Sequence, residues 1–149
     1  MKFEFREAPV PASGAEAEPN TASSRALLTK FGISLPPTTA DFLNGRMKIW
    51  ECTVDSLAVG HCAGDSATGE VISLGVIPGY QGQGIGRRLL SLVVDWLRAQ
   101  GADRIWLAAP ADRSLRAHGF YRALGWRPSG ERNEDGSEIL ELPRDHGRW

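Results

Sequence analysis

The chain is 149 residues long, with 42% hydrophobic residues, 17 basic and 18 acidic side chains and a formal net charge of −1. This length fits one domain, and the hydrophobic share excludes a wholly disordered chain. The sequence has no run of 18 apolar residues, which argues against a membrane span, and no apolar leader, which argues against a signal peptide. It has only two cysteines, too few for a disulfide scaffold or a cysteine-based zinc site. We therefore expect one cytoplasmic domain over residues 1–149, with no metal site and no membrane or nucleic-acid partner.

The amino-terminal third predicts one strand followed by two helices. Residues 2–6 alternate between polar and apolar side chains, as a strand does, whereas residues 8–20 are rich in Pro, Ala, Gly and Glu and predict a mobile loop. Helical spacing and stop signals then predict one helix between residues 23 and 32 and a shorter one between residues 38 and 45.

Three strands are expected next, at residues 47–54, 57–64 and 70–77. The turns between them are short, so these strands should be antiparallel neighbours. The third strand is almost entirely apolar, which predicts a central strand covered on both faces.

Helices and strands alternate in the carboxy-terminal half. A glycine-rich loop at 78–84 opens a long helix over residues 85–100, which Gly101 ends. The elements expected after it are a strand at 104–109, a helix from Asp112 or Ser114 to Leu124, two strands at 126–132 and 137–142 around an Asp135-Gly136 turn, and a loose tail at 144–149. The resulting order, β-α-α-β-β-β-α-β-α-β-β, indicates the α/β class with a mixed (α+β) sheet.

Gly82, Gly84 and Gly86 lie between the buried strand and the long helix. Glycine lets a backbone approach a ligand closely and a helix amino terminus favours an anion, so this loop predicts a phosphate cradle, with Arg87 and Arg88 offering further contacts. The alternative is a plain strand-to-helix turn, for which one glycine would suffice. A P-loop is excluded because no Gly-Lys-Ser/Thr is present, and the third glycine comes one residue too early for a dinucleotide-binding G-x-G-x-x-G.

Positive charge is concentrated in the segment that follows this loop. Residues 1–86 carry a net charge of −3, residues 87–132 hold nine arginines against four acidic residues, and residues 133–149 carry −3 again. The positive block begins at the loop, and no series of stacking aromatic residues accompanies its arginines. This pattern favours a small polyanionic ligand over a nucleic acid.

Three stretches resemble the GNAT N-acetyltransferase superfamily. The first, Gln81-Gly82-Gln83-Gly84-Ile85-Gly86, satisfies the Gln/Arg-x-x-Gly-x-Gly/Ala signature of that family's acyl-CoA pyrophosphate loop. The second, Leu74-Gly75-Val76-Ile77-Pro78, is similar to the family's strand ending in x-V-x-P, and the third, Ala117 to Trp126, matches its A-x-x-F-Y-x-x-x-G-F/W helix. The resemblance is specific over residues 70–126 and concerns only the topology elsewhere.

The resemblance implies a GNAT-like fold in which two central parallel strands splay apart to hold the pantetheine arm of acetyl-CoA. A bulge in the first of these strands is expected at Gly75, and the amide near Leu74 is expected to act as an oxyanion donor. The implied cofactor-binding residues are Leu74, Val76, Gln81, Gly82, Gln83, Gly84, Ile85, Gly86, Arg87, Arg88, Ser114 and Tyr121. At Ser114 the family often has Asn instead.

Catalysis is implied at two side chains. Tyr121 matches the family's acid, which protonates the leaving thiolate, although a tyrosine beside Phe120 is also compatible with simple core packing. Glu70 matches the base of some members, but a solvated carboxylate or a water chain is the alternative, and Ser73 is a candidate for holding such a water. His61 and Cys62 are adjacent in a strand and point to opposite faces, so a structural role is expected for both.

The resulting hypothesis is an acetyl-CoA-dependent N-acetyltransferase that acts by direct transfer in a ternary complex. The alternative is a non-catalytic acyl-CoA-binding sensor module. The acidic flanks suggest a cationic acceptor, such as a polyamine, an aminoglycoside or a peptide amine, although solvated surface carboxylates produce the same charge count. Many members of the family dimerise, so a homodimer is an option.

Overall fold

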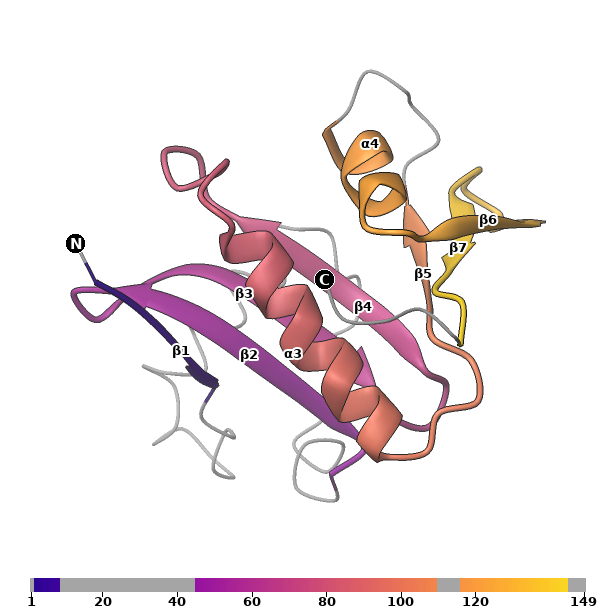
Figure 1. Ribbon diagram of the computed structural model, residues 1–149, viewed down its shortest axis with the longest axis horizontal. Helices are drawn as coiled ribbons and strands as arrows, with labels where there is room; N and C mark the ends of the chain where they lie inside the picture. Colours follow the sequence, from indigo (N-terminus) through magenta and orange to yellow (C-terminus); the bar gives the residue numbers. More distant parts are fainter. Residues whose placement is uncertain (1, 9–44, 110–115, 145–149) are drawn as a thin grey trace.

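The computed structural model describes residues 2–8, 45–109 and 116–144 (Figure 1). Within these ranges the chain forms, in order, β1 (Phe3–Glu7), β2 (Met47–Val54), β3 (Leu57–Asp65), β4 (Glu70–Val76), α3 (Ile85–Ala99), β5 (Trp106–Ala109), α4 (Arg116–Ala123), β6 (Arg127–Arg132) and β7 (Glu138–Glu141).

The strands form one mixed sheet, as predicted, in the order β1-β2-β3-β4-β5-β7-β6. All neighbours are antiparallel except β4 and β5, which are parallel. The full predicted order of elements is not reproduced, because all but the first residue of the loop expected at 8–20, and the two helices expected after it, lie outside the described residues. The expected tail beyond Arg144 lies outside them too.

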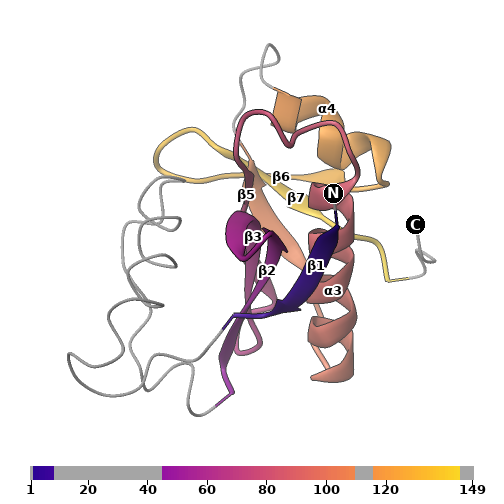
Figure 2. The same ribbon diagram turned by 90° about the vertical axis from the view of Figure 1, so that its left-hand side faces the viewer.

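Helix α3 covers one face of β2, β3 and β4 (Figures 1 and 2). Its apolar residues recur every three or four positions, so Leu89, Val93 and Leu97 line one stripe, and all three are fully buried against the sheet. Burying each such side chain stabilises the fold by about 2 kcal/mol. Neither α3 nor α4, the helices within the described ranges, is long and apolar enough to cross a membrane.

Strands β4 and β5 pair with each other only at their first residues. Glu70 and Trp106 are their single register pair. At the same end, the Trp106 amide donates to the carbonyl of Gly69 at 3.1 Å, and its indole Nε1 donates to the carbonyl of Thr68 at 3.0 Å. Beyond this junction the two strands diverge (Figure 1), which leaves a wedge in the middle of the sheet.

The bulge in β4 is not at Gly75, so that prediction was wrong. Gly75 stays in register opposite His61, and the register with β3 shifts between Val71 and Ser73, where Ile72 is the extra residue. Coverage of β4 also differs from the prediction. Only Val71 and Gly75 are buried, because β5 turns away and leaves the rest of the strand half-exposed.

Candidate active site

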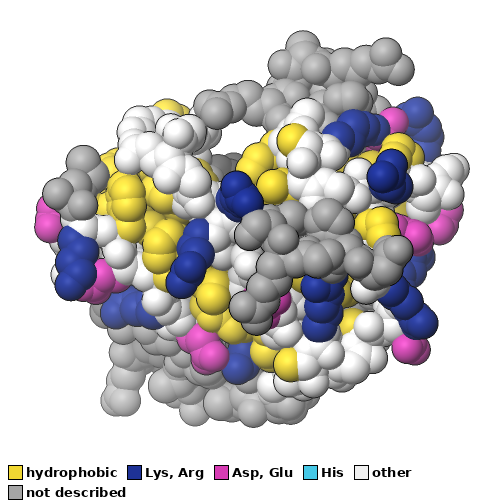
Figure 3. Space-filling view, viewed as in Figure 1, with side chains coloured by type: hydrophobic (Ala, Val, Ile, Leu, Met, Phe, Trp, Pro, Cys, Tyr) yellow, Lys and Arg dark blue, Asp and Glu magenta, His cyan; other side chains and the backbone are white. Residues whose placement is uncertain are grey.

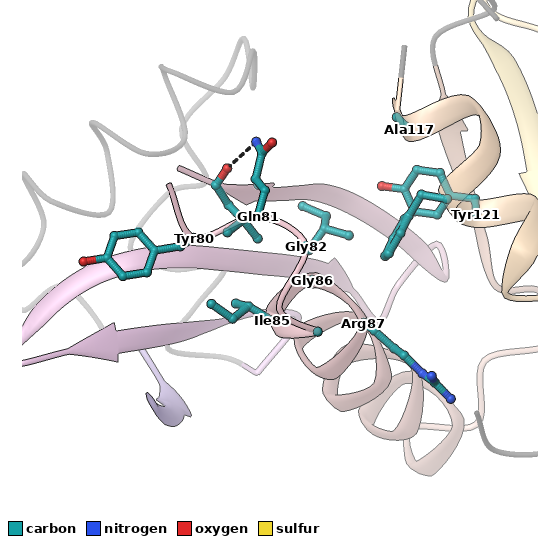
Figure 4. A pocket seen from close by; sticks show the side chains of 13 residues that line it. Tyr80, Gln81, Gly82, Ile85, Gly86, Arg87, Ala117 and Tyr121 are labelled. Atoms are coloured by element: carbon teal, nitrogen blue, oxygen red, sulfur yellow. Dashed lines mark hydrogen bonds between the residues drawn. The ribbon is translucent and has the colours of Figure 1, made fainter. Parts of the chain in front are cut away.

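A cavity of about 250 Å³ occupies the wide end of the wedge (Figure 4). Its walls come from the end of β4, the glycine-rich loop, the first turn of α3 and one side of α4. The lining residues predicted from the sequence are Leu74, Val76, Gln81, Gly82, Gly84, Ile85, Gly86, Arg87 and Tyr121. Segments that are far apart in the chain therefore meet around one space.

The glycine-rich loop presents an uncapped helix end to this cavity. Gly82 and Gly84 have φ angles of 77° and 84°, which side chains other than glycine rarely adopt. Gly84 is the N-cap of α3, so no side chain caps the helix, and the first turn holds no acidic residue. The first N–H groups of a helix have no partner within it, and they attract negative charge. Gln81 fixes the loop by donating to the carbonyl of Val76 at 3.0 Å (Figure 4).

Gly86 keeps the space between α3 and α4 open. A Cβ atom at this position would lie 3.6 Å from Cζ of Phe120 and 3.8 Å from Cγ2 of Val76, which are ordinary van der Waals distances. The protein itself therefore does not require glycine here. A ligand that approaches the backbone of the first helical turn would require it.

The two arginines after the loop do not point the same way. The Arg87 stem lines the cavity, and its guanidinium extends away from the loop in Figure 4. The Arg88 guanidinium lies 5.6 Å from the centre of the Phe5 ring, beside β1, and Arg88 is not among the cavity's lining residues. Gln83 does not line the cavity either, and its side chain donates to the carbonyl of Gly79 at 3.5 Å. Ser114 lies outside the described residues.

Several arginines of the positive block pair with acidic residues instead of facing the cavity. Arg104 contacts Glu131 at 2.7 Å and Glu141 at 2.5 Å, and Arg122 contacts Glu138 at 2.5 Å. Figure 3 shows basic and acidic side chains interspersed over the β6–β7 end of the molecule. The positive charge of the block is therefore divided between the rim of the cavity and ion pairs with acidic residues of β6 and β7.

Tyr121 projects from α4, and Figure 4 shows its hydroxyl directed toward the cavity. The side chain is 9% exposed and packs edge-on against Phe120 and Trp126. Burial raises the pKa of the phenol, and the nearby Cys62 thiol adds to the rise. The hydroxyl therefore stays protonated at neutral pH and is available as a donor.

Glu70 lies apart from the cavity, at the β4–β5 junction. Burial raises the pKa of its carboxyl, and the negative charge of Asp65 on β3 raises it further. Leu74 lies four positions after Glu70 along the strand, a distance of roughly 13 Å. Any proton transfer between Glu70 and a group near Leu74 would therefore need intervening water.

Sequence reasoning missed some of the residues around the site. Tyr80, Gly75, Ala117 and Phe120 also line the cavity. Tyr80 immediately precedes the loop signature and Phe120 lies within the quoted helix pattern, so both were visible but carried no assigned role. The hydrogen bond between His61 and Ser73 joins two strands, and no local pattern predicts it.

Comparisons with known proteins agree with this geometry. A model of the acetyltransferase (GNAT) family matches residues 41–126. The mycothiol acetyltransferase of Beutenbergia cavernae is 45% identical over 64 residues, which are 43% of this chain and 21% of that protein. The [ribosomal protein bS18]-alanine N-acetyltransferase of Escherichia coli K12 is 32% identical over 108 residues, which are 67% of this chain and 66% of that protein.

The fold also matches a solved structure along almost its whole length. The crystal structure of PaiA N-acetyltransferase from Thermoplasma acidophilum, in complex with coenzyme A, superposes with a TM-score of 0.67 at 16% identity. The match covers 95% of this chain and 99% of that one, and at this identity it shows the fold alone.

Proposed function

Since the chain belongs to the GNAT acetyltransferase family, we propose that it moves an acetyl group from acetyl-CoA to a primary amine by direct transfer in a ternary complex. The observation that carries this proposal is the cavity in the β4–β5 wedge, which runs from an uncapped helix end to Leu74 and Tyr121. One end of it offers backbone donors for phosphate, and the other offers groups suited to acyl transfer.

The phosphates of acetyl-CoA are proposed to bind the amides of the loop and the first turn of α3, around Gly82, Gly84 and Gly86. Arg87 adds a flexible positive charge at the rim. The pantetheine arm then follows β4, where Leu74 and Val76 have no ladder partners from β5 and can pair with its amides. Arg88 and Gln83 contribute little in this arrangement, because neither faces the cavity.

Transfer forms a bond between the amine nitrogen and the acetyl carbon and breaks the carbon–sulfur bond. One proton leaves the nitrogen, and the departing thiolate takes one up. The Leu74 amide is proposed to stabilise the carbonyl oxygen as negative charge develops on it. Tyr121 donates its hydroxyl hydrogen toward the sulfur. Because the phenol pKa is raised, hydrogen bonding to the sulfur is the larger part of this role.

The acceptor is proposed to be a primary amine that delivers its proton to water, with Glu70 as the final base at the end of a water chain. The two relatives described above carry names that refer to different molecules, mycothiol for one and the alanine of ribosomal protein bS18 for the other. A peptide amino terminus and a small amine are therefore both included in the acceptor class.

Two measurements test this proposal. Isothermal titration with acetyl-CoA should show saturable binding, and CoA release should be stimulated by at least one member of a panel containing an N-terminal alanyl peptide, spermidine and an aminoglycoside. The matching Nα-acetylated peptide is the control, because it has no free amine. Tight binding without stimulated release by any amine would favour a sensor module, and a lack of acetyl-CoA binding would contradict both functions.

A further inference from the structure

The face of the sheet opposite α3 carries a hydrogen-bonded pair of polar side chains. Trp50, Cys52 and Cys62 pack in the cluster with α3. Because side chains alternate along a strand, His61 faces the other side, in register with Gly75 of β4. There its Nε2 lies 2.5 Å from Oγ of Ser73.

Ser73 places this pair next to the site of acyl transfer. It immediately precedes Leu74, and consecutive Cα atoms are about 3.8 Å apart. His61 is only 1% exposed, whereas Ser73 is half-buried. A ligand can therefore reach the pair through the serine hydroxyl but not through the imidazole.

The geometry of acyl transfer directs the acceptor to this face. Tyr121, the proposed donor to the departing sulfur, packs in the α3 cluster near Cys62. The sulfur therefore leaves toward the α3 side. A nucleophile attacks one of the two faces of the planar thioester. Since α3 and Tyr121 occupy one side of the sheet, the amine approaches the carbon near Leu74 from the other side, where Ser73 and His61 lie.

We propose that Ser73, held in place by His61, binds the acceptor amine: Ser73 Oγ accepts an N–H from the amine and donates its own hydroxyl hydrogen to Nε2 of His61. This inference rests on the proposed function. Ser73 is the binding residue, and His61 is a positioning residue that acts through it. The contact turns the nitrogen lone pair toward the thioester carbon, and no proton is transferred to either side chain.

The surroundings of His61 keep the imidazole neutral. Burial lowers its pKa to about 4, so Nε2 is able to accept a hydrogen bond near neutral pH. The carboxylate directly opposite His61 in the register is Glu51 of β2, whose charge is paired with Arg6 at 2.8 Å. Asp65 and Glu70 lie at the far ends of β3 and β4, and Arg46 pairs with Asp65 at 3.0 Å.

Kinetics of single variants test the proposal, with the N-terminal alanyl peptide and spermidine as acceptors. Ser73→Ala should lower kcat/KM for the better acceptor at least tenfold, while the Kd for acetyl-CoA stays within twofold of the wild type. His61→Leu should behave like Ser73→Ala. His61→Gln should recover most of the loss, because the glutamine carbonyl can accept the serine hydrogen. Ser91→Ala, on the partly exposed side of α3, is the control and should leave both constants unchanged.

Each outcome decides a different claim. A wild-type protein that acetylates none of the amines would contradict the proposed function and this inference with it. An active wild type with unchanged kcat/KM in Ser73→Ala would overturn this inference alone, even if the His61 variants failed to fold. A ¹⁵N–¹H spectrum of the imidazoles adds a readout besides activity: Nε2 of His61 should be unprotonated at pH 7, and a protonated Nε2 would overturn the proposed hydrogen-bond direction.

Discussion

Replacing Gly86 by alanine should separate the stability of the protein from its ability to bind acetyl-CoA. The new Cβ would lie 3.6 Å from Phe120 and 3.8 Å from Val76, so it creates no clash in the free protein. Gly86 lies within α3 and its φ is not positive, and alanine is favoured over glycine in a helix by about 0.5–1 kcal/mol. Gly86→Ala should therefore be as stable as the wild type or slightly more stable.

Binding should respond in the opposite direction. The added methyl group lies between Val76 and Phe120 at the wall of the cavity, where the phosphates of acetyl-CoA are proposed to approach the backbone. We expect at least a tenfold weaker Kd for acetyl-CoA, about 1.4 kcal/mol, measured by isothermal titration beside a thermal melt. Gly119→Ala on α4 is the matched control, because its Cβ meets nothing within 4 Å and it does not line the cavity. An unchanged Kd in a stable Gly86→Ala would refute the proposed approach of the ligand.

Three further predictions concern the junction, the donor and the buried histidine. Gly69→Ala places a Cβ 1.8 Å from the carbonyl oxygen of Arg104 at a φ of +78°, so urea unfolding should show a loss of about 3 kcal/mol or more; a loss below 1 kcal/mol would contradict this. Tyr121→Phe should lower kcat more than tenfold without changing acetyl-CoA affinity, and an unchanged kcat would remove Tyr121 from the mechanism. The folded-state pKa of His61, about 4, lies below its usual value, so its contribution to stability is present above pH 6.5 and falls by about 2 kcal/mol between pH 7 and 5. His61→Gln should flatten that dependence in urea titrations, and an equally steep profile would contradict it.

The features that sequence reasoning predicted well are those set by local patterns. The apolar stripe of α3, the glycine-rich loop before it and the Asp135-Gly136 turn each depend on neighbouring residues, and the structure places all three as expected. The parallel pairing of β4 and β5 followed from the topology that the resemblance implied, and the structure has it.

The features that were missed depend on residues distant in the chain. The bulge lies at Ile72 because the register of β4 is set by its pairing with β3, whereas Gly75 drew attention only as an unusual residue in an apolar run. Arg88 directly follows Arg87, yet successive helical positions differ by about 100° in direction, so Arg88 faces Phe5. Net charge over a stretch of sequence likewise cannot show that Arg104 is neutralised by Glu131 and Glu141.

The most direct test of the account is to follow the backbone amides while acetyl-CoA is added. In a ¹⁵N–¹H correlation spectrum of the full chain, the amides of Gly82, Gly84, Gly86 and Leu74 should shift together and saturate at one equivalent of ligand. That result is predicted because these groups border the same cavity. Saturable shifts that leave these four amides unchanged, or no saturable shifts at all, would contradict the placement of acetyl-CoA in the β4–β5 wedge.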